Sequence, residues 1–225
     1  VTLLSLGEGG GDLYGARHRP LRLGQENYLD RALAFREAVW DVLAEERCEV
    51  VHYRSMWAAL PVAEEQARRG YRSLCEVNGV DSIELKYHYP ALRGRPDVLN
   101  KLRAQERLAF TTADALVTPS EVTGRYLVAH GAPEGRVTVI PNGVDLERFH
   151  PAPAPANDPP VLLYLGTLAP WQGLDLLLDA LRRVLPHRAV RLRVLGAGTR
   201  RWGRALDTLI GKWGLAEAVE MLPAV

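Results

Sequence analysis

Short apolar runs alternate with longer segments of helical spacing along most of this 225-residue chain. Short apolar runs bounded by turn residues indicate buried strands, and apolar residues at every third or fourth position indicate helices. The alternation therefore predicts an α/β fold built from largely parallel, doubly wound sheets with helices on both faces. In such sheets, ligands bind at the carboxyl ends of the strands, where loops lead into helices.

The expected elements follow one another in a regular order. Strands are expected at residues 48–53, 73–77, 115–118, 136–140, 161–166, 189–195 and 218–222. Helices are expected at residues 28–46, 59–70, 97–113, 121–131, 173–186 and 200–214. Ser120 should cap the helix that follows it, and Gly70 and Gly131 should end theirs. The first helix is expected to bury one stripe of side chains, namely Leu29, Ala32, Leu33, Val39, Trp40 and Leu43.

A proline-rich segment divides the sequence. Residues 150–160 contain five prolines and no apolar period, which is typical of a semi-stiff linker between domains. A surface loop within one domain is the alternative. We expect one Rossmann-like domain over residues 1–149 and a second over residues 161–225. Because the second has only three expected strands, we predict that it is truncated and leaves an exposed sheet edge and an uncovered face.

The charge of the chain limits the partners that it can have. A net charge of only +1 argues against a nucleic-acid binder. Residues 161–225 carry nine basic and five acidic side chains, which a phosphate-bearing ligand would favour, although a solvated arginine-rich surface explains the same charge. No apolar run approaches the roughly 18 residues of a membrane-spanning helix. Cys48 and Cys75 lack metal-ligand spacing and indicate reduced thiols, hence a cytoplasmic protein.

Two glycine turns follow strands of the second predicted domain. The first runs from Gly166 to Gly173, and the second contains Gly196 and Gly198, each ahead of a predicted helix. Helix N-termini attract anions because unpaired N–H groups and the helix dipole both point there. Tight strand–helix turns also need glycine for steric reasons, so phosphate binding and simple packing stay as alternatives.

The most specific pattern lies between the two predicted domains. Its sharp Pro-Asn-Gly turn ends one sheet and leads into the linker. The residues that carry it are Ala113, Asp114, Ser120, Pro141, Asn142, Gly143, Val144, Asp145, Phe149 and Pro151. They resemble the end of the N-terminal domain in retaining GT-B glycosyltransferases of family 4, the group 1 glycosyl transferases. The resemblance implies two Rossmann-like domains, acceptor side first and nucleotide-sugar side second, with Pro141, Asn142, Gly143 and Asp145 at the hinge.

The resemblance extends into the first glycine turn of the second domain. Relatives usually have G-R-x-x-x-x-K-G there, and the arginine and lysine hold the donor diphosphate. This chain has Thr167 and Gln172 at those positions, which donate hydrogen bonds without the added strength of a charge. Three alternatives follow from the missing positive charge. Another cation replaces it, for which Arg200, Arg201 and Arg204 are the candidates; or the donor is bound differently; or diphosphate binding is weak. The donor-binding residues implied are Gly166, Thr167, Gln172, Gly173, Gly196 and Gly198.

Two loops of the first domain are expected to bind the acceptor or the transferred sugar, because they follow predicted strands. Their candidate residues are Arg54, Trp57, Asn78, Gly79, Glu84 and Lys86. Many relatives have a sugar-contacting histidine where this chain has Asn78, which can bond a hydroxyl but cannot act as a base. Ordinary packing is the alternative for Trp57 and Tyr87. A solvated helix end is the alternative for Glu84, Lys86 and Tyr87.

Two parts of the family pattern lie outside this sequence. The glutamate pair that binds the nucleotide ribose and the sugar would follow Val225, and the first strand and its glycine loop would precede Val1. The run GEGGGD at residues 7–12 lacks phosphate-loop spacing and is interpreted as a flexible loop. We therefore expect a fragment that is inactive alone and whose catalytic residues are unknown.

The resemblance implies transfer of a hexosyl group from a nucleoside diphosphate sugar to a sugar, lipid or small-molecule hydroxyl, with retention of configuration, in carbohydrate biosynthesis. No cofactor or metal is expected, because no carboxylate or histidine cluster has ligand spacing. A lipid acceptor would place a cytoplasmic protein at the membrane surface. One alternative is a degenerate binding or scaffold subunit. Another is a GT-B nucleotide-sugar epimerase, for which His52 and His88 are the nearby histidines and neither has a recognisable partner in the sequence.

Overall fold

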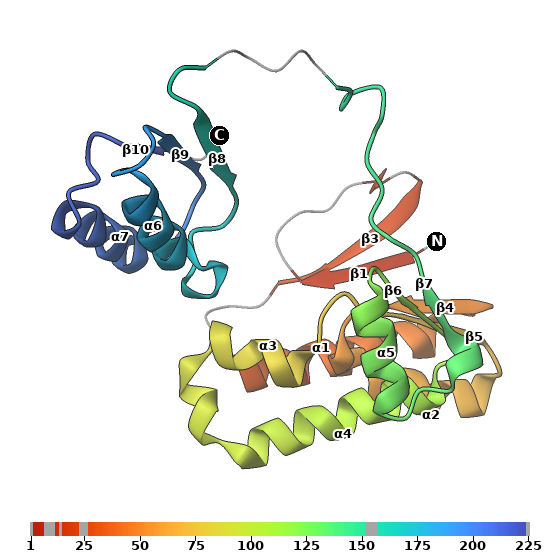
Figure 1. Cartoon of the computed structure of the whole chain (residues 1–225). Coiled ribbons are helices and arrows are strands. Elements are labelled where there is room, and N and C mark those ends of the chain that lie inside the picture. Colours follow the sequence, from red (N-terminus) through yellow and green to blue (C-terminus); the bar gives the residue numbers. More distant parts are fainter. Residues whose placement is uncertain (1, 7–11, 14, 23–26, 152–156, 224–225) are drawn as a thin grey trace. The chain divides into compact units, whose positions relative to one another are not determined.

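The chain forms two compact units, and no described core cluster has residues in both. The computed structural model describes residues 2–6, 12–13, 15–22, 27–151 and 157–223. Unit 1 spans Val1–Val144 and unit 2 spans Asp145–Val225. The division falls inside the expected hinge and a few residues ahead of the boundary predicted at residue 149. Figure 1 shows the elements of both units along the chain.

Four parallel strands form the main sheet of unit 1. They are β4 (Val50–Tyr53), β5 (Arg72–Glu76), β6 (Ala115–Thr118) and β7 (Val137–Val139), and they pair in this order. Strands β4, β6 and β7 lie within segments predicted from their apolar runs, and β5 begins one residue before its predicted segment. The parallel register places the carboxyl ends of β4 and β5 side by side, with Tyr53 opposite Cys75.

Four of the five described helices of unit 1 lie where the sequence pattern predicts them, and α3 was not predicted as a helix. The five helices are α1 (Tyr28–Glu45), α2 (Ala59–Arg69), α3 (Asp81–His88), α4 (Pro96–Thr112) and α5 (Glu121–Ala129), with short turns η1 (Met56–Ala58), η2 (Pro90–Gly94) and η3 (Glu134–Arg136). Ser120 caps α5 by accepting a bond of 3.1 Å from the Thr123 N–H, as predicted. Gly70 ends α2 in the left-handed conformation, with φ of 75°, a conformation that glycine adopts without a steric cost.

The buried stripe predicted for α1 is only partly correct. Val39 and Leu43 are buried in the main core, but Leu29 and Leu33 keep 48% and 46% of their surface exposed. The helical period identifies one face of α1, yet only the second half of that face has a neighbour that covers it. The first half lines a pocket beside α4.

A small sheet at the start of unit 1 was not predicted. Strand β3 (Ala16–Leu21) pairs in parallel with β1 (Thr2–Leu6) and antiparallel with β2 (Asp12–Leu13). Strand β3 is rich in basic residues and lacks an apolar run. Two ion pairs connect it to the end of α1: Arg19 to Glu45 at 2.6 Å and Arg17 to Glu46 at 3.3 Å. Most of the predicted glycine loop at residues 7–12 lies outside the described residues.

Asp114, which matches the family pattern, stabilises the start of the β5–β6 pair. Its carboxylate accepts hydrogen bonds from the Ser73 N–H at 2.9 Å, Gln66 Nε2 at 2.7 Å and Arg72 Nη1 at 3.2 Å. The Ser73 N–H is the largest cause of a pKa of Asp114 below its usual value, followed by the nearby Arg72. The side chain therefore joins α2 to two strands.

We expect Asp114→Ala to lower the free energy of unfolding by about 2 kcal/mol, because it leaves a buried Ser73 N–H without its acceptor. Urea unfolding followed by circular dichroism measures the change. Asp97→Ala is the control, because Asp97 forms an exposed ion pair with Arg95, and this substitution should change the free energy of unfolding little. Equal effects of the two substitutions would contradict a structural role for Asp114.

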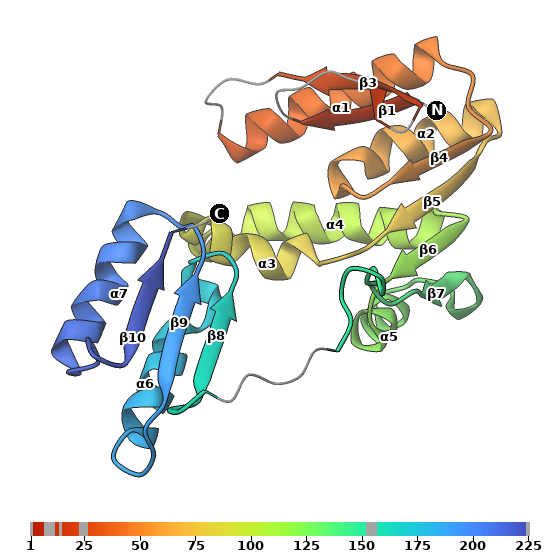
Figure 2. The same ribbon diagram turned by 90° about the horizontal axis from the view of Figure 1, so that it is seen from above.

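Unit 2 is a three-stranded parallel sheet with two long helices. Its strands β8 (Val161–Leu165), β9 (Arg191–Leu195) and β10 (Val219–Leu222) pair in the order β10-β9-β8 (Figure 2). Helices α6 (Leu174–Val184) and α7 (Arg200–Lys212) pack against the strands in one core. On the other face of the sheet, Leu163 and Leu165 of β8 are 64% and 71% exposed, as the expected uncovered face predicts.

Candidate functional site

Two loops of unit 1 meet at the carboxyl end of its main sheet. Arg54 directly follows β4, and Asn78 and Gly79 follow β5. Because β4 and β5 are neighbours in a parallel sheet, their carboxyl ends lie at one edge. The structure thus brings together candidate residues that are more than twenty positions apart in the sequence.

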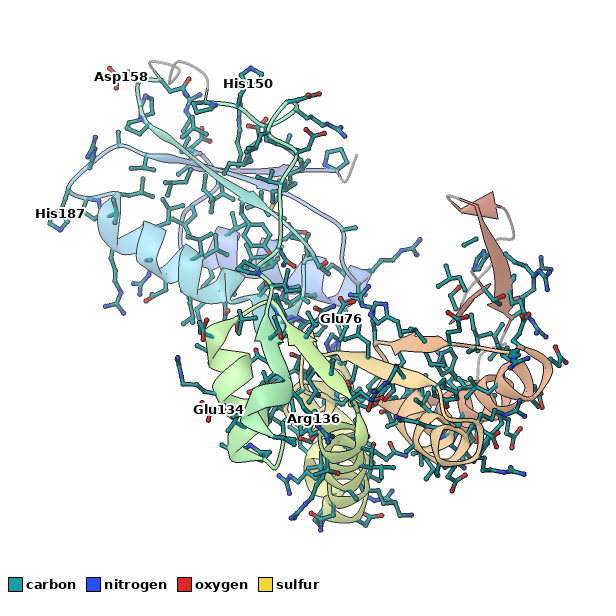
Figure 3. All side chains as sticks on the ribbon, turned by 90° about the vertical axis from the view of Figure 1, so that its right-hand side faces the viewer. Glu76, Glu134, Arg136, His150, Asp158 and His187 are labelled. Carbon is teal, nitrogen blue, oxygen red and sulfur yellow. The ribbon has the colours of Figure 1, made fainter. Side chains whose placement is uncertain are left out.

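Glu76, the last residue of β5, links these loops. Its Oε1 accepts hydrogen bonds from Asn78 Nδ2 at 2.9 Å and pairs with Arg54 Nε at 3.1 Å. Its Oε2 lies 3.0 Å from His52 Nε2 on β4. Figure 3 labels Glu76 among the side chains of unit 1. Sequence reasoning missed this residue, although a carboxylate at the last position of a strand was the available signal.

The partners of Glu76 keep its carboxylate ionised. The hydrogen bond from Asn78 is the largest cause of a pKa below the usual value, and nearby Arg54 and His52 add to it. An ionised carboxylate with three donors is a poor proton donor near neutral pH but a firm anchor for those donors. Glu76 therefore orients Arg54 and Asn78. The expectation that His52 has no partner is wrong, because the register of β4 and β5 brings it to Glu76.

The remaining candidates of the second loop lie on α3. The Glu84 carboxylate covers the backbone of Gly79 so closely that a Cβ atom at Gly79 would overlap it. Lys86 lies on the last turn of α3 with its Nζ 5.2 Å from the centre of the Tyr87 ring. Tyr87 is 42% exposed, so within unit 1 it is not a core residue. The Lys86–Tyr87 contact fits the alternative of a solvated helix end.

Trp57 belongs to an aromatic cluster. Its Nε1 donates a hydrogen bond of 2.9 Å to the Tyr28 hydroxyl, and its ring lies edge-on to the rings of Tyr28 and Phe35. The N–H of Trp57 is held by the Ser55 hydroxyl, which begins η1. These contacts support the packing interpretation of Trp57, and its ring also lines the pocket beside α4.

A buried carboxylate supports the start of α3. Glu106 of α4 is only 3% exposed and accepts bonds from the Ser82 N–H at 2.6 Å and the Ser82 hydroxyl at 2.7 Å. Helix starts leave N–H groups without partners inside the helix, and Glu106 satisfies one of them. Burial raises the pKa of Glu106. The neighbouring Asp81 is affected more, since burial and the charges of Glu106 and Glu84 raise its pKa to about 6.

We expect Asp81→Asn to stabilise the protein at about pH 7.5 but not at about pH 4. A carboxyl group whose pKa is higher in the folded state binds its proton more tightly there, so stability falls as pH rises from the unfolded to the folded pKa. The amide removes this loss. Urea unfolding at both pH values measures it. Asp97→Asn is the control, because Asp97 forms an exposed ion pair with Arg95, and this substitution should change stability little at either pH. A benefit of Asp81→Asn that is equal at both pH values would contradict the account.

The two glycine turns of unit 2 pack against each other. The Gly166 N–H donates to the Leu195 carbonyl at 3.1 Å, and the Leu168 N–H donates to the Ala197 carbonyl at 2.7 Å. A methyl group at Gly196 would overlap the Gly166 carbonyl oxygen, and one at Gly198 would overlap that of Leu168. Close backbone approach therefore explains both glycines, as the steric alternative predicts, and the Gly166 N–H already has an acceptor.

The other predicted donor-side residues, Thr167, Gln172 and Gly173, lie in the loop between β8 and α6. The Thr167 carbonyl accepts a bond of 2.8 Å from the Tyr164 hydroxyl, and Gln172 ends the short turn η4 (Pro170–Gln172). Gly173 has φ of 72° and is the N-cap residue of α6. Thr199 caps α7 through the Trp202 N–H at 3.3 Å. Arg200, Arg201 and Arg204 are exposed on the first turns of α7.

The hinge residues mark the division between the units. Pro141, Asn142 and Gly143 are exposed, and the Asp145 carboxylate accepts bonds from the Glu147 and Arg148 N–H groups at 3.0 and 3.2 Å. Asp145 thus forms a local turn at the first position of unit 2. Residues 152–156 of the predicted linker lie outside the described residues, and the described residues on either side have no helix or strand.

The described residues contain no group of three or more histidine, cysteine, aspartate or glutamate side chains arranged to hold a metal ion. None of the helices that the structure describes is both long and apolar enough to cross a membrane. Cys48 and Cys75 are free thiols, and burial raises the pKa of Cys75 to about 12.

Solved structures share this arrangement of parallel sheets and helices. Sucrose-phosphate synthase from Thermosynechococcus elongatus matches with a TM-score of 0.73 and 17% identity over 95% of this chain and 56% of its own. The Anabaena protein HepE in complex with UDP-glucose matches with a TM-score of 0.67 and 18% identity over 94% and 57%. The chain therefore has the α/β architecture of these GT-B structures. A family model for Glycosyltransferase Family 4 matches residues 1–148, and the chain belongs to that family.

Curated relatives agree with this assignment. A putative colanic acid biosynthesis glycosyltransferase, WcaL of Escherichia coli (strain K12), is 32% identical over 127 residues, which are 56% of this chain and 31% of WcaL. A D-inositol 3-phosphate glycosyltransferase of Geodermatophilus obscurus is 34% identical over 152 residues, 60% of this chain and 34% of that enzyme. The chain spans about a third of the length of these relatives.

Proposed function

We propose that the protein transfers a hexosyl group from a nucleoside diphosphate sugar to a hydroxyl group of a sugar, lipid or small molecule, with retention of anomeric configuration. Membership of the glycosyltransferase family supports transfer of a sugar, and HepE, which shares the fold, binds UDP-glucose. The observation in this chain that carries the proposal is the Glu76 carboxylate, which holds Arg54 and Asn78 at the carboxyl edge of the main sheet.

On the acceptor side, Arg54 and Asn78 supply hydrogen-bond donors to hydroxyl groups. Arg54 keeps donors beyond the Nε that faces Glu76, and the Asn78 amide keeps an acceptor oxygen. Because Glu76 fixes both side chains, a sugar that binds them meets oriented groups and loses less freedom in the transfer step. The charge of Glu76 offsets that of Arg54, so this edge favours neutral hydroxyl groups over an anion.

On the donor side, we assign the diphosphate to the starts of α6 and α7. Both are long helices, preceded by Gly173 and by Thr199. Their N–H groups and dipoles attract an anion, and Arg200, Arg201 and Arg204 supply the positive charge that Thr167 and Gln172 lack. Stabilising the negative charge that develops on the leaving diphosphate is the usual way in which such a site lowers the barrier.

A binding or scaffold role is the second candidate. Thr167, Gln172 and Asn78 are neutral where relatives have charge or a histidine, and the Gly166 N–H is taken by the Leu195 carbonyl. These features favour weak donor binding. An epimerase role has one observation in its favour, the His52–Glu76 pair at 3.0 Å, since a histidine with a carboxylate partner is suited to proton transfer.

Calorimetry with UDP, GDP and ADP distinguishes a transferase from a scaffold. We expect the protein, expressed at the full length of its gene, to bind one of the three, and the triple change Arg200→Gln, Arg201→Gln and Arg204→Gln to weaken binding at least tenfold by removing charge-assisted bonds. Lys212→Gln at the other end of α7 is the control. Absence of binding to all three diphosphates would favour the scaffold, and exchange of solvent deuterium into the sugar would favour the epimerase.

A further inference from the structure

A pocket of about 420 Å³ lies in unit 1 beside the aromatic cluster. It is bounded by α1, η1 and α4, and Tyr28, Trp57, Val98 and Leu102 form its apolar lining. Leu29 and Leu33, one helical turn apart on α1, complete the lining while keeping nearly half of their surface exposed. A volume in this range is typical of small-molecule sites. The pocket is thus large enough for a ligand and mainly apolar.

The exposed leucines are the first indication that the pocket has an occupant. A single exposed leucine is ordinary on a protein surface. Two that adjoin a pocket with further apolar side chains form a continuous apolar surface, and such surfaces usually mark binding sites. The sequence pattern places Leu29 and Leu33 on the buried stripe of α1, yet no described element covers them.

The charges around the pocket are the second indication. Arg36 and Lys101 are among its lining residues, and the described lining contains no aspartate or glutamate. Arg36 Nε is buried without a hydrogen-bond partner, while its guanidinium carbon lies 5.5 Å from the centre of the Trp40 ring. Because Nε is enclosed by protein atoms, the charge that Arg36 offers a ligand comes from its delocalised guanidinium group. Together with the Lys101 ammonium group it makes the lining positive, which favours a ligand with an anionic group.

We infer that this pocket binds an amphiphile with a single hydrocarbon chain and an anionic headgroup. The chain lies among Leu29, Leu33, Trp57 and Leu102, and the headgroup meets Arg36 and Lys101. This binding needs no donor sugar and stands apart from the proposed transfer. If the acceptor of the proposed transfer is a lipid, its hydrocarbon chain lies in this pocket, and that role alone rests on the proposed function.

Calorimetry with decyl phosphate below its micelle concentration, without nucleotide sugar, tests the inference. We expect saturable binding of one molecule per chain. Octyl phosphate should bind about 15-fold more weakly, because it lacks two methylenes and each buried methylene strengthens binding by about fourfold. Decyl glucoside, which is neutral, should also bind at least tenfold more weakly, and inorganic phosphate should show no saturable binding. No binding of decyl phosphate, or equal binding of decyl glucoside, would overturn the inference.

Four variants locate the site. Leu33→Asp and Lys101→Gln should each weaken decyl phosphate binding at least fivefold, because they remove apolar lining and headgroup charge respectively. Leu176→Asp and Lys212→Gln are matched controls on the helices of unit 2, where Leu176 is 73% exposed, and should leave binding unchanged. Circular dichroism verifies that each variant is folded. If both pocket variants bind like the unmodified chain, or if the controls lose as much, the pocket is not the site.

Discussion

Replacing Gly196 with alanine is expected to destabilise unit 2 by about 3 kcal/mol, because an added methyl group in a tightly packed place forces the backbone to move. The methyl would overlap the carbonyl oxygen of Gly166, which is backbone and has no rotamer to change. The Gly166 N–H bond to Leu195 and the Leu168 N–H bond to Ala197 lie in the same contact. Moving the turns apart would therefore break hydrogen bonds that hold β8 beside β9.

Hydrogen exchange of the β9 amides in the whole chain measures this loss in unit 2 separately from unit 1. Gly211→Ala is the matched control, because a Cβ at Gly211 meets nothing within 4 Å and the residue lies in α7. Alanine is the better helix former, so that variant should be unchanged or more stable by about 0.5–1 kcal/mol. If Gly196→Ala proves as stable as Gly211→Ala, then close backbone approach does not explain the glycine at position 196. Phosphate binding would then be the better explanation of this turn.

The second large effect is expected at Glu76. Glu76→Ala should lower kcat/KM for sugar transfer by about 10- to 100-fold, since hydrogen bonds to charged partners contribute about 1.5–3 kcal/mol. Glu76→Gln keeps an acceptor oxygen for Asn78 or Arg54, although it loses the charge. We therefore expect the amide to restore part of the activity. The loss should lie mainly in kcat if Arg54 and Asn78 act in the transfer step and mainly in KM if they only hold the acceptor.

The control for Glu76 is Asp97→Asn, which removes an exposed carboxylate of unit 1 that forms an ion pair with Arg95. Its kcat/KM should equal that of the unmodified protein. A purely structural role for Glu76 would lower thermal stability and leave the kinetics of the folded fraction intact. Full activity of folded Glu76→Ala would show that Arg54 and Asn78 do not need this anchor.

Local pattern was enough to predict most of the fold. Every segment predicted as a strand or helix from its apolar period contains one in the structure, because buried strands and amphipathic helices need that spacing. Strand β3 escaped prediction because its residues Arg17, His18 and Arg19 are polar, and its pairing with β1 and ion pairs to α1 come from distant parts of the chain.

Contacts between distant segments limited what could be predicted of the site. Glu76 pairs with Arg54 and His52, and these residues are brought near it by the register of β4 and β5. The apolar period of α1 includes Leu29 and Leu33 but cannot say whether another helix covers them. Glycine in a strand–helix turn fits phosphate binding and close packing equally well, and only the Gly196–Gly166 approach distinguishes the two.

Release of nucleoside diphosphate from a panel of nucleotide sugars tests the central claim most directly. The protein is expressed at the full length of its gene and assayed with UDP-, GDP- and ADP-linked hexoses, with and without simple sugar and lipid acceptors. We predict that one donor is consumed by transfer or slow hydrolysis, that Glu76→Ala lowers transfer, and that the released or transferred sugar first has the anomeric configuration of the donor. Consumption of none of the donors, or a product of inverted configuration, would contradict the account.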